Sequence, residues 1–374
     1  MATNIPEKVR IQVWTEAAGR CQFNNCNRPL WYNELTLSKR NFSEMAHIIG
    51  SSEKGPRGGD QSEELAKDPD NIMLMCDRCH KEIDDTELRK LYSVERLKAM
   101  KKEHTNRVRM LLDQPSKKTR PLILTSDIGK QQTMFGNRSI SNAILPNYPD
   151  KISEDWFRID IGSFDRKNIN HWNIAKEKID ESMESIERAI SSGRVDHLSV
   201  FGLTKQPLLM WLGKKLGDKV SAQIFEPRRT DDLEKKWSWD NSEEITIEYT
   251  ASNIKVGDSD DVILLLALSD YLNQDKYQNM IESNYHVYQL TIDEPVQGFL
   301  KNKSDKSSFI HHCRSLLNII QKEVGNNCTI HVLPAMPASL AIEFGRLIQP
   351  TKDPKIWVYE NIGNKKPEKI IELL

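Results

Sequence analysis

Four of the six cysteines occur as two close pairs, Cys21 with Cys26 and Cys76 with Cys79. The second pair has the C-x2-C spacing that lets two thiolates bind one metal ion from a tight turn. The first pair, spaced C-x4-C, can supply two more sulfur atoms across the intervening chain. Because four thiolates favour tetrahedral coordination of zinc, the spacing predicts a structural Zn²⁺ site formed by Cys21, Cys26, Cys76 and Cys79.

Two histidines and an asparagine accompany the cysteines. His47 ends an apolar-flanked run, residues 43–47, that we expect to be a strand. Asn71 precedes the C-x2-C pair, and His80 follows it directly. Phosphodiester hydrolysis needs a base that deprotonates water and a hard cation that balances charge on the phosphate. An imidazole can be the base, and Mg²⁺ or a similar divalent ion the cation. His47, Asn71 and His80 are therefore candidate catalytic residues.

Other elements must position these residues. The apolar spacing over residues 6–19 predicts an amphipathic helix that leads into Cys21, and the spacing over residues 87–112 predicts another. We expect His104 to be a solvated side chain on the second helix. The glycine-rich stretch of residues 51–60 predicts a loop that either brings Arg57 to a phosphate or is a plain surface loop.

The order His, Asn, His within paired cysteines resembles the zinc-stabilised HNH endonucleases, in which two strands and a helix fold over one divalent metal. The resemblance implies that His47 is the general base, that His80 binds the catalytic metal, and that Asn71 binds the metal or fixes the loop. Many members carry Asp directly before the first histidine, where this chain has Ala46. The second protein ligand of the metal is therefore open, with Glu44 a weak candidate.

Length and composition limit the other possibilities. A chain of 374 residues predicts two or three domains, and a net charge of -1 argues against polyanion binding by the whole surface. The cysteines outside the pairs, Cys313 and Cys328, suit a reducing compartment, and no apolar run approaches the length of a membrane span. We expect a soluble cytoplasmic protein that makes no membrane contact. Any DNA contact would come from a local basic patch, which could also be a solvated helix face: Lys98, Lys101, Lys102, Arg107 and Arg109.

Beyond residue 150 short apolar runs alternate with longer amphipathic ones, which predicts an α/β domain. A strand, helix and strand over residues 198–203, 208–216 and 221–226 have a counterpart over residues 330–335, 339–348 and 355–360. This repeat favours two related halves, although any α/β chain yields similar units.

If both halves are Rossmann-like, the loops after their strands face one crevice, where helix amino termini favour anions. The chain has neither GxGxxG nor a P-loop, which argues against NAD or ATP chemistry. Guanidinium groups suit phosphates, and indoles either stack on bases or pack in the core. The candidate nucleotide-binding residues are Lys205, Gln206, Arg228, Arg229, Trp237, Trp239, Pro337 and Ser339.

Three stretches carry a second resemblance. Phe201-Gly202-Leu203 with Pro207-Leu208-Leu209, Trp237-Ser238-Trp239 and residues 334–341 look like the SAVED domain, a fusion of two CARF-like halves that senses cyclic oligonucleotides. Joined to an HNH module, this domain looks like the HNH–SAVED effectors of bacterial CBASS antiphage systems. The resemblance implies a DNase that stays silent until a cyclic nucleotide binds, assembles on binding, and acts by abortive infection.

We therefore expect an α+β HNH module of the ββα-metal type over residues 1–112, a connector over 113–150, and an α/β SAVED sensor over 151–374. The expected activity is metal-dependent, largely sequence-nonspecific cleavage of double-stranded DNA, switched on by a cyclic dinucleotide or another cyclic oligonucleotide. We expect a resting dimer or monomer that becomes a larger oligomer, such as a tetramer, on binding ligand. The alternatives are a restriction-type HNH nuclease whose C-terminal domain senses modified DNA, and a non-catalytic, nucleotide-regulated zinc-ribbon protein that binds DNA.

Overall fold

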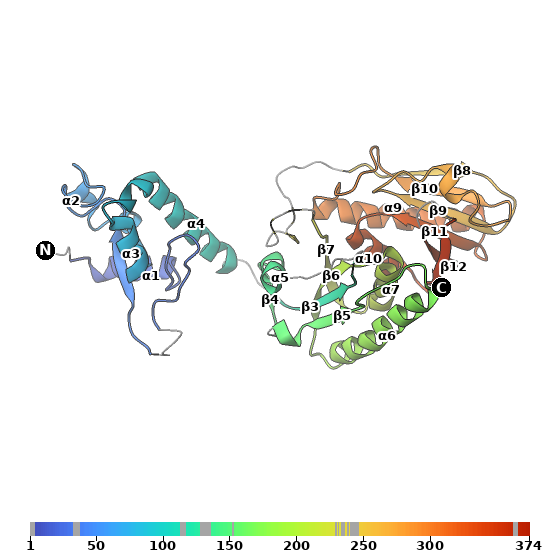
Figure 1. Ribbon diagram of the computed structural model, residues 1–374, viewed down its shortest axis with the longest axis horizontal. Coiled ribbons are helices and arrows are strands. Elements are labelled where there is room, and N and C mark those ends of the chain that lie inside the picture. The colour runs from blue at the N-terminus through green and yellow to red at the C-terminus, as the bar shows by residue number, and fades with distance from the viewer. Residues whose placement is uncertain are drawn as a thin grey trace. The chain divides into compact units, whose positions relative to one another are not determined.

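The computed structural model describes residues 4–32, 38–112, 117–127, 136–151, 153–228, 230, 232, 236–237, 239, 247–361 and 366–374. The chain divides into two compact units, Met1–Ser116 and Lys117–Leu374. Figure 1 shows the two units, with the first in blue to teal and the second in green to red.

The N-terminal unit is built on the antiparallel pair of strands β1 (Ser43–His47) and β2 (Ile72–Cys76) and on helix α3 (Asp77–Asp84), which follows β2 directly. Strand β1 coincides with the predicted strand. The remaining elements surround this ββα unit: α1 (Glu7–Glu16), α2 (Ser62–Leu65), η1 (Pro69–Asn71), η2 (Leu88–Leu91) and α4 (Val94–Leu112). The helix predicted from residue 87 therefore begins later, after the short helix η2.

A small apolar core holds this unit together. Every side chain of β2 is buried, and Val13 of α1, Leu97 of α4 and Ile83 of α3 pack in the same core as the strand. The cysteines Cys21, Cys76 and Cys79 belong to it as well. Because thiols form part of so small a core, the fold of this unit is coupled to the state of its cysteines.

The first sheet of the C-terminal unit is parallel. Its order is β4-β3-β6-β7, with β5 beside β3. Helix α6 (Ile169–Ser191) precedes β6, and α7 (Gln206–Leu216) connects β6 to β7. The strand bounds are β3 (Lys118–Thr125), β4 (Tyr148–Pro149), β5 (Phe157–Asp160), β6 (His197–Leu203) and β7 (Ser221–Phe225).

The second sheet has the order β13-β12-β11-β9-β10-β8, parallel in its centre and antiparallel at β8 and β13. Helix α9 (Lys303–Glu323) precedes β11, and α10 (Ala338–Leu347) connects β11 to β12. The short helix α8 (Gln274–Tyr277) lies between β9 and β10 in the chain. The strand bounds are β8 (Thr250–Lys255), β9 (Asp261–Ala267), β10 (His286–Thr291), β11 (Thr329–Ala335), β12 (Lys355–Glu360) and β13 (Glu368–Glu372).

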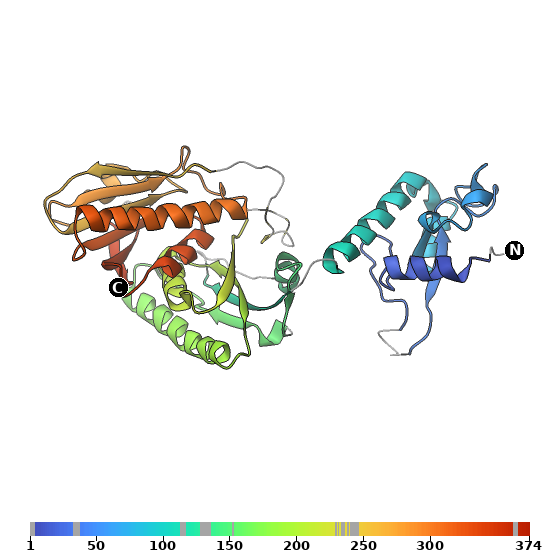
Figure 2. The same cartoon turned by 180° about the vertical axis from the view of Figure 1, so that it is seen from behind.

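The two halves repeat one arrangement, as the sequence predicted. Each has a strand, a helix and a neighbouring parallel strand: β6-α7-β7 in one and β11-α10-β12 in the other. Helices α7 and α10 pack against each other, and they lie together near the centre of the unit in Figures 1 and 2. One apolar core, which includes Leu209 of α7 and Ile342 of α10, extends through both halves.

Glycine makes the contact between α7 and α10 unusually close. A Cβ atom on Gly213 would lie 2.0 Å from the carbonyl oxygen of Ile342, and one on Gly345 would lie 2.0 Å from that of Met210. Only hydrogen fits at these positions, so the two helix backbones touch. Gln206 adds a polar link across the halves, because its side chain donates to the carbonyl of Met336 at 3.1 Å and accepts from the Met336 N–H at 3.4 Å.

The predicted connector over residues 113–150 is wrong for the part that the structure describes. Lys118–Thr125 forms strand β3, which pairs with β6 inside the sheet, and the C-terminal unit begins at Lys117. Residues 113–116 lie outside the described residues. In the part of the chain that the structure describes, no helix is both long and apolar enough to cross a membrane.

Candidate functional site

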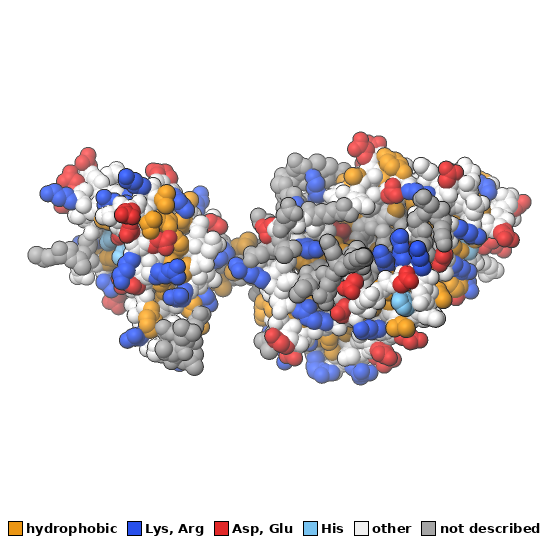
Figure 3. Space-filling model, viewed as in Figure 1, with side chains coloured by type: hydrophobic (Ala, Val, Ile, Leu, Met, Phe, Trp, Pro, Cys, Tyr) orange, Lys and Arg blue, Asp and Glu red, His pale blue; other side chains and the backbone are white. Residues whose placement is uncertain are grey.

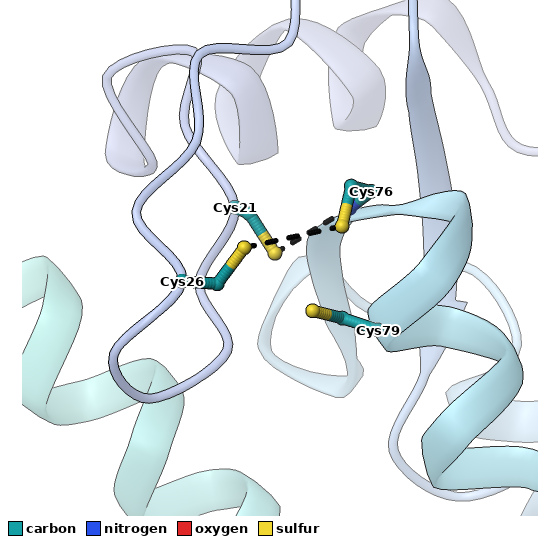
Figure 4. Close-up of side chains that lie close together, drawn as sticks. All are labelled: Cys21, Cys26, Cys76 and Cys79. Atoms are coloured by element: carbon teal, nitrogen blue, oxygen red, sulfur yellow. Dashed lines mark hydrogen bonds between the residues drawn. The ribbon is translucent and has the colours of Figure 1, made fainter.

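The four paired cysteines converge, as their spacing predicted. Their sulfur atoms all lie within 4.8 Å of one another, and Cys26 Sγ is 3.9 Å from Cys76 Sγ. Figure 4 shows Cys21 and Cys26 on one loop, and Cys76 at the end of β2 with Cys79 in the first turn of α3. Four thiolates around a zinc ion, each at about 2.3 Å, lie roughly 3.8 Å apart, so the observed separations fit that ion.

Cys21 is the thiol of this cluster that its neighbours favour as a thiolate. A hydrogen bond with Cys79 lowers the pKa of Cys21 to about 5 against the opposing effect of burial, and the same bond raises the pKa of Cys79. The backbone N–H of Cys76 also donates to Cys21 Sγ at 3.4 Å. Gln22 ties the cysteine loop to β2, because its side-chain oxygen accepts from the Leu74 N–H at 2.8 Å. The donor set is therefore that of a structural zinc site.

His47 is half-buried at the end of β1, opposite Ile72 of β2. Its Nε2 atom lies 3.0 Å from the carbonyl oxygen of Ala66. Since a carbonyl oxygen only accepts, this contact places the ring proton of a neutral His47 on Nε2. The lone pair of Nδ1 is then available to accept a proton, as a general base requires.

Asn71 is almost fully buried directly before β2. Its side-chain oxygen accepts from the Ile49 N–H at 2.8 Å, and its amide donates to the carbonyls of Ile49 at 2.9 Å and Leu65 at 3.2 Å. All of these partners are backbone groups of the chain between β1 and β2. Of the two roles that the sequence left open for Asn71, the hydrogen bonds support fixing the loop that follows His47.

His80 lies on α3 and is partly exposed, with 29% of its side-chain surface accessible. Its Nε2 atom lies 3.4 Å from Asp84 Oδ2, one helical turn later. Asp84 in turn pairs with Arg57 at 2.7 Å. Although burial raises the pKa of Asp84, hydrogen bonds from His80 and Arg57 hold it below its usual value.

The sequence left two interpretations of Arg57 open, a phosphate contact or a residue of a plain surface loop. The structure corrects both. Only 8% of its side-chain surface is exposed. Its guanidinium donates to the carbonyls of Ile48 at 2.7 Å and Ile83 at 2.6 Å, and to that of His47 at 3.3 Å. Arg57 therefore joins the end of β1 to the end of α3, and with them the segments that carry His47 and His80.

Helix α4 corrects two further predictions. His104 is buried rather than solvated, and its Nε2 atom lies 3.0 Å from the carbonyl oxygen of Ala17. Lys101 is buried as well and donates to the carbonyls of Ile72, at 2.8 Å, and Pro69. The exposed basic residues of the predicted patch are Lys98, Lys102, Arg107 and Arg109.

These exposed cations do not dominate the surface around them. Figure 3 shows Lys and Arg interspersed with Asp and Glu on the visible face of the N-terminal unit. A hollow of about 390 Å³ on α4 brings Lys98, Lys102 and Arg109 together with the carboxylates of Glu16 and Asp70. The nearby acidic groups reduce the attraction of this face for a polyanion.

The C-terminal unit has a cavity of about 670 Å³ between its two halves. That volume is in the range of small-molecule sites. Three cationic side chains and one carboxylate line the described part of its wall: Arg228, Lys236, Lys301 and Glu226. The other lining residues are Leu203, Gln206, Pro227, Thr230, Ser269, Gln297, Gly298, Leu300, Met336, Pro337 and Ala338.

The cavity includes three of the candidate nucleotide-binding residues: Gln206, Arg228 and Pro337. Lys205 and Ser339 are outside its lining, although each is next to a lining residue in the chain. Ser339 is fully buried, and its N–H donates to Glu226 at 2.7 Å. Arg229 lies outside the described residues.

The tryptophans do not take the expected stacking position in this cavity. Trp237 is buried and packs edge-on against Phe201, with ring centroids 5.1 Å apart. Trp239 is partly buried against the main core. Neither lines the cavity, so the core-packing interpretation holds for the indoles that the structure describes.

Glu226 is one of three charged lining residues that the candidate list missed, with Lys236 and Lys301. It follows β7 directly and accepts from the N–H of Ser339 in the first turn of α10. Burial raises the pKa of Glu226 to about 7, although hydrogen bonds from Ser339 and Ala338 and the charge of Lys306 oppose this shift. Its place after a strand of a parallel sheet was a usable signal, because ligands bind at the carboxyl ends of such strands.

A comparison with curated proteins found no match. Among solved structures, the chain is similar to the Cap4 SAVED/CARF-domain containing receptor of Acinetobacter baumannii with the cyclic trinucleotide 2'3'3'-cAAA, at 14% identity and a TM-score of 0.44. That alignment covers 84% of this chain and 66% of the receptor. The Cap4 receptor of Moraxella osloensis gives 12% identity and a TM-score of 0.39, covering 79% of this chain and 60% of that one. The chain thus spans less than two thirds of these receptors.

A family model assigns the larger unit. The model described as "SMODS-associated and fused to various effectors sensor domain", SAVED, matches residues 178–372, which is more than half of the chain. The match begins within α6, ends with β13 and includes both repeated strand-helix-strand units and residues of the cavity. The chain therefore belongs to the SAVED family of sensor domains.

Proposed function

We propose that this protein is a metal-dependent endonuclease of double-stranded DNA whose activity is controlled by a cyclic oligonucleotide. The observation that carries the nuclease proposal is the ββα arrangement of His47, Asn71 and His80 beside the four cysteines. Asn71 holds the loop after His47, and Arg57 joins the segments that carry the two histidines. The order of these residues and the two strands and helix that carry them support the HNH proposal.

The residues divide the reaction among them. His47, with its Nε2 proton directed at Ala66, accepts a proton from the attacking water at Nδ1. His80 supplies an imidazole ligand for a divalent ion such as Mg²⁺, which when bound provides positive charge for the phosphate and the leaving oxygen. Cys21, Cys26, Cys76 and Cys79 would hold the structural zinc that keeps β2 and α3 in place.

The sensing proposal rests on the SAVED family and on the cavity between the halves. Three cations in its described wall match the phosphates of a cyclic di- or trinucleotide, and both halves contribute to the lining. This favours nucleotide control over the alternative of a C-terminal domain that senses modified DNA. We propose that the protein acts in CBASS-type antiphage defence, where it degrades DNA in the cytoplasm and so causes abortive infection.

The tight packing of α7 against α10 bears on how the signal is passed. Because the helix backbones touch at Gly213 and Gly345 and one core extends through both halves, ligand cannot readily close one half onto the other. We therefore propose that ligand acts at the rim of the cavity, where it favours assembly of the resting dimer or monomer into a larger oligomer such as a tetramer. Assembly would bring two nuclease sites to one duplex.

Plasmid cleavage tests the function directly. Purified protein with Mg²⁺ is incubated with a panel of cyclic di- and trinucleotides, and mass is followed by light scattering on the same samples. We expect cleavage with one member of the panel only, together with a rise in mass, and a loss of at least 100-fold in His47→Ala. The exposed histidine His311 of α9 gives the matched control, because His311→Ala should cut like the wild type. Wild-type cleavage by His47→Ala would reject the assigned base.

A further inference from the structure

A divalent ion at His80 needs a second protein ligand, and β1 does not supply one. Ala46, at the position where many HNH enzymes carry Asp, is fully buried in the apolar core. Glu44, the weak candidate from the sequence, is exposed, and the alternation of side chains along β1 places it on the face opposite His47. The ligand must therefore come from another element.

Helix α3 offers a carboxylate at the required place. His80 and Asp84 are four residues apart, so they lie on the same helix face, and His80 Nε2 is 3.4 Å from Asp84 Oδ2. Two ligands on adjacent positions of an octahedral ion, each at about 2.1 Å, lie roughly 3.0 Å apart. Both side chains are also partly open to solvent, at 29% and 33%. A metal ion can therefore reach both groups with little movement.

Arg57 binds only one of the two oxygen atoms of the Asp84 carboxylate. The guanidinium binds Asp84 Oδ1 at 2.7 Å, whereas the oxygen nearest His80 is Oδ2. The same guanidinium donates to the carbonyls of Ile48 and Ile83. These bonds fix the carboxylate relative to the end of β1, where His47 lies.

The helix gives an independent reason to expect a cation here. Asp84 is the last residue of α3, where the helix dipole disfavours negative charge. Hydrogen bonds from His80 and Arg57 already stabilise the Asp84 carboxylate, and a divalent ion between Asp84 and His80 would add positive charge at this helix end.

We infer that Asp84 is the second protein ligand of the catalytic metal, through Oδ2, and that Arg57 is its positioning residue. This inference rests on the proposed nuclease function. In this assignment, a carboxylate of α3 takes the place of the Asp that is absent at position 46, where the chain has Ala46. Helix α3 then supplies both protein ligands.

Binding of Mn²⁺ to the full-length protein tests the inference without relying on cleavage. Calorimetry compares the wild type with Asp84→Asn, His80→Ala and Asp85→Asn, and zinc content is measured for each. Asp85 is the matched control, because asparagine keeps the acceptor that binds the N–H groups of Glu87 and Leu88. We expect Mn²⁺ affinity to fall at least tenfold in Asp84→Asn and His80→Ala and to stay unchanged in Asp85→Asn, with zinc retained in all.

The outcomes separate this inference from the function on which it rests. If Asp84→Asn binds Mn²⁺ like the wild type while His80→Ala does not, Asp84 is not a ligand and the inference fails alone. If His80→Ala also binds Mn²⁺ normally, the proposed catalytic metal site fails. Should Asp84→Asn lose its zinc, Asp84→Ser replaces it: the hydroxyl still accepts a hydrogen bond but supplies no carboxylate, so unchanged Mn²⁺ affinity would again overturn the ligand role.

Discussion

The two units hold their sites together by different means. In the N-terminal unit, three polar side chains bind backbone carbonyls: Asn71, Arg57 and Lys101. The cluster of four cysteines is the other element that holds the site together. In the C-terminal unit, the cavity is bounded by halves that share an apolar core and touch through glycines of α7 and α10. The first site should therefore fail when a polar or metal ligand is lost, and the second when packing is disturbed.

The largest effect is expected from Cys76→Ser. Loss of one thiolate should release zinc, and because structural zinc contributes on the order of 10 kcal/mol, the N-terminal unit should unfold. The C-terminal unit, which has its own core, should stay folded. Calorimetric melting should show that one transition is lost and one kept, and elemental analysis should show less than one zinc per chain.

A buried thiol outside the cluster is the control for this prediction. Cys328→Ala removes a sulfur atom from the core of the C-terminal unit and should lower only the second transition, with zinc unchanged. A folded, zinc-free Cys76→Ser protein would show that the unit does not depend on its metal, and the comparison between the units would lose its basis.

The next effect is expected from Gly345→Ala. Alanine favours a helix over glycine by about 1 kcal/mol, so helix propensity alone predicts a more stable protein. The added Cβ would, however, lie 2.0 Å from the carbonyl oxygen of Met210. We expect the C-terminal unit to lose about 2 kcal/mol or more and to bind nucleotide more weakly, because α7 and α10 must separate.

Gly136→Ala is the matched substitution, because a Cβ atom there meets no atom of the described residues within 4 Å. Thermal melting of the C-terminal unit should be nearly unchanged in this variant. A stabilised Gly345→Ala protein would show that the helices can move apart at little cost, and closure of the halves by ligand would again be possible.

Much of the first site was predictable because its residues are close in sequence. Cys76, Cys79 and His80 are close in sequence and lie together at the start of α3, and the strand predicted over residues 43–47 coincides with β1. The burial of Lys101 and His104 was not predictable, because periodicity does not reveal which polar side chain on a helix finds a carbonyl. The Arg57–Asp84 pair joins a loop to the end of a helix across 27 residues, and no local pattern reveals it.

The second site was less predictable because its wall is assembled from separate loops. The repeat correctly indicated a crevice between halves, and Gln206 and Pro337 line it. Strand β3 lies within the predicted connector, and it contains Pro121, a residue type that usually excludes a central strand. The structure accommodates this residue where β3 changes partner on one side, from β4 at Lys118 and Thr119 to β5 beginning at Leu122.

The last effect concerns Glu226, which makes ligand binding in the cavity of the C-terminal unit depend on pH. With a pKa of about 7, this carboxyl is mostly ionised at pH 8 and mostly neutral at pH 6, and it lines the cavity together with Arg228, Lys236 and Lys301. Ionised Glu226 repels an anionic ligand. We therefore expect the tightest-binding cyclic nucleotide of the panel to bind roughly tenfold more weakly at pH 8 than at pH 6.

Glu226→Gln should remove that dependence and bind at pH 8 as the wild type does at pH 6, whereas the exposed Glu294→Gln should behave like the wild type.

Folding gives a second measurement that needs no ligand. The unfolded chain releases this proton near pH 4.5 and the folded chain near 7, so the folded state binds more protons in between. The free energy of unfolding should fall by about 3 kcal/mol as pH rises through this window, and Glu226→Gln should flatten that fall. Equal slopes in the two proteins would show that Glu226 does not carry the linkage, and the pH dependence of binding would then have to come from the ligand or from groups outside the cavity.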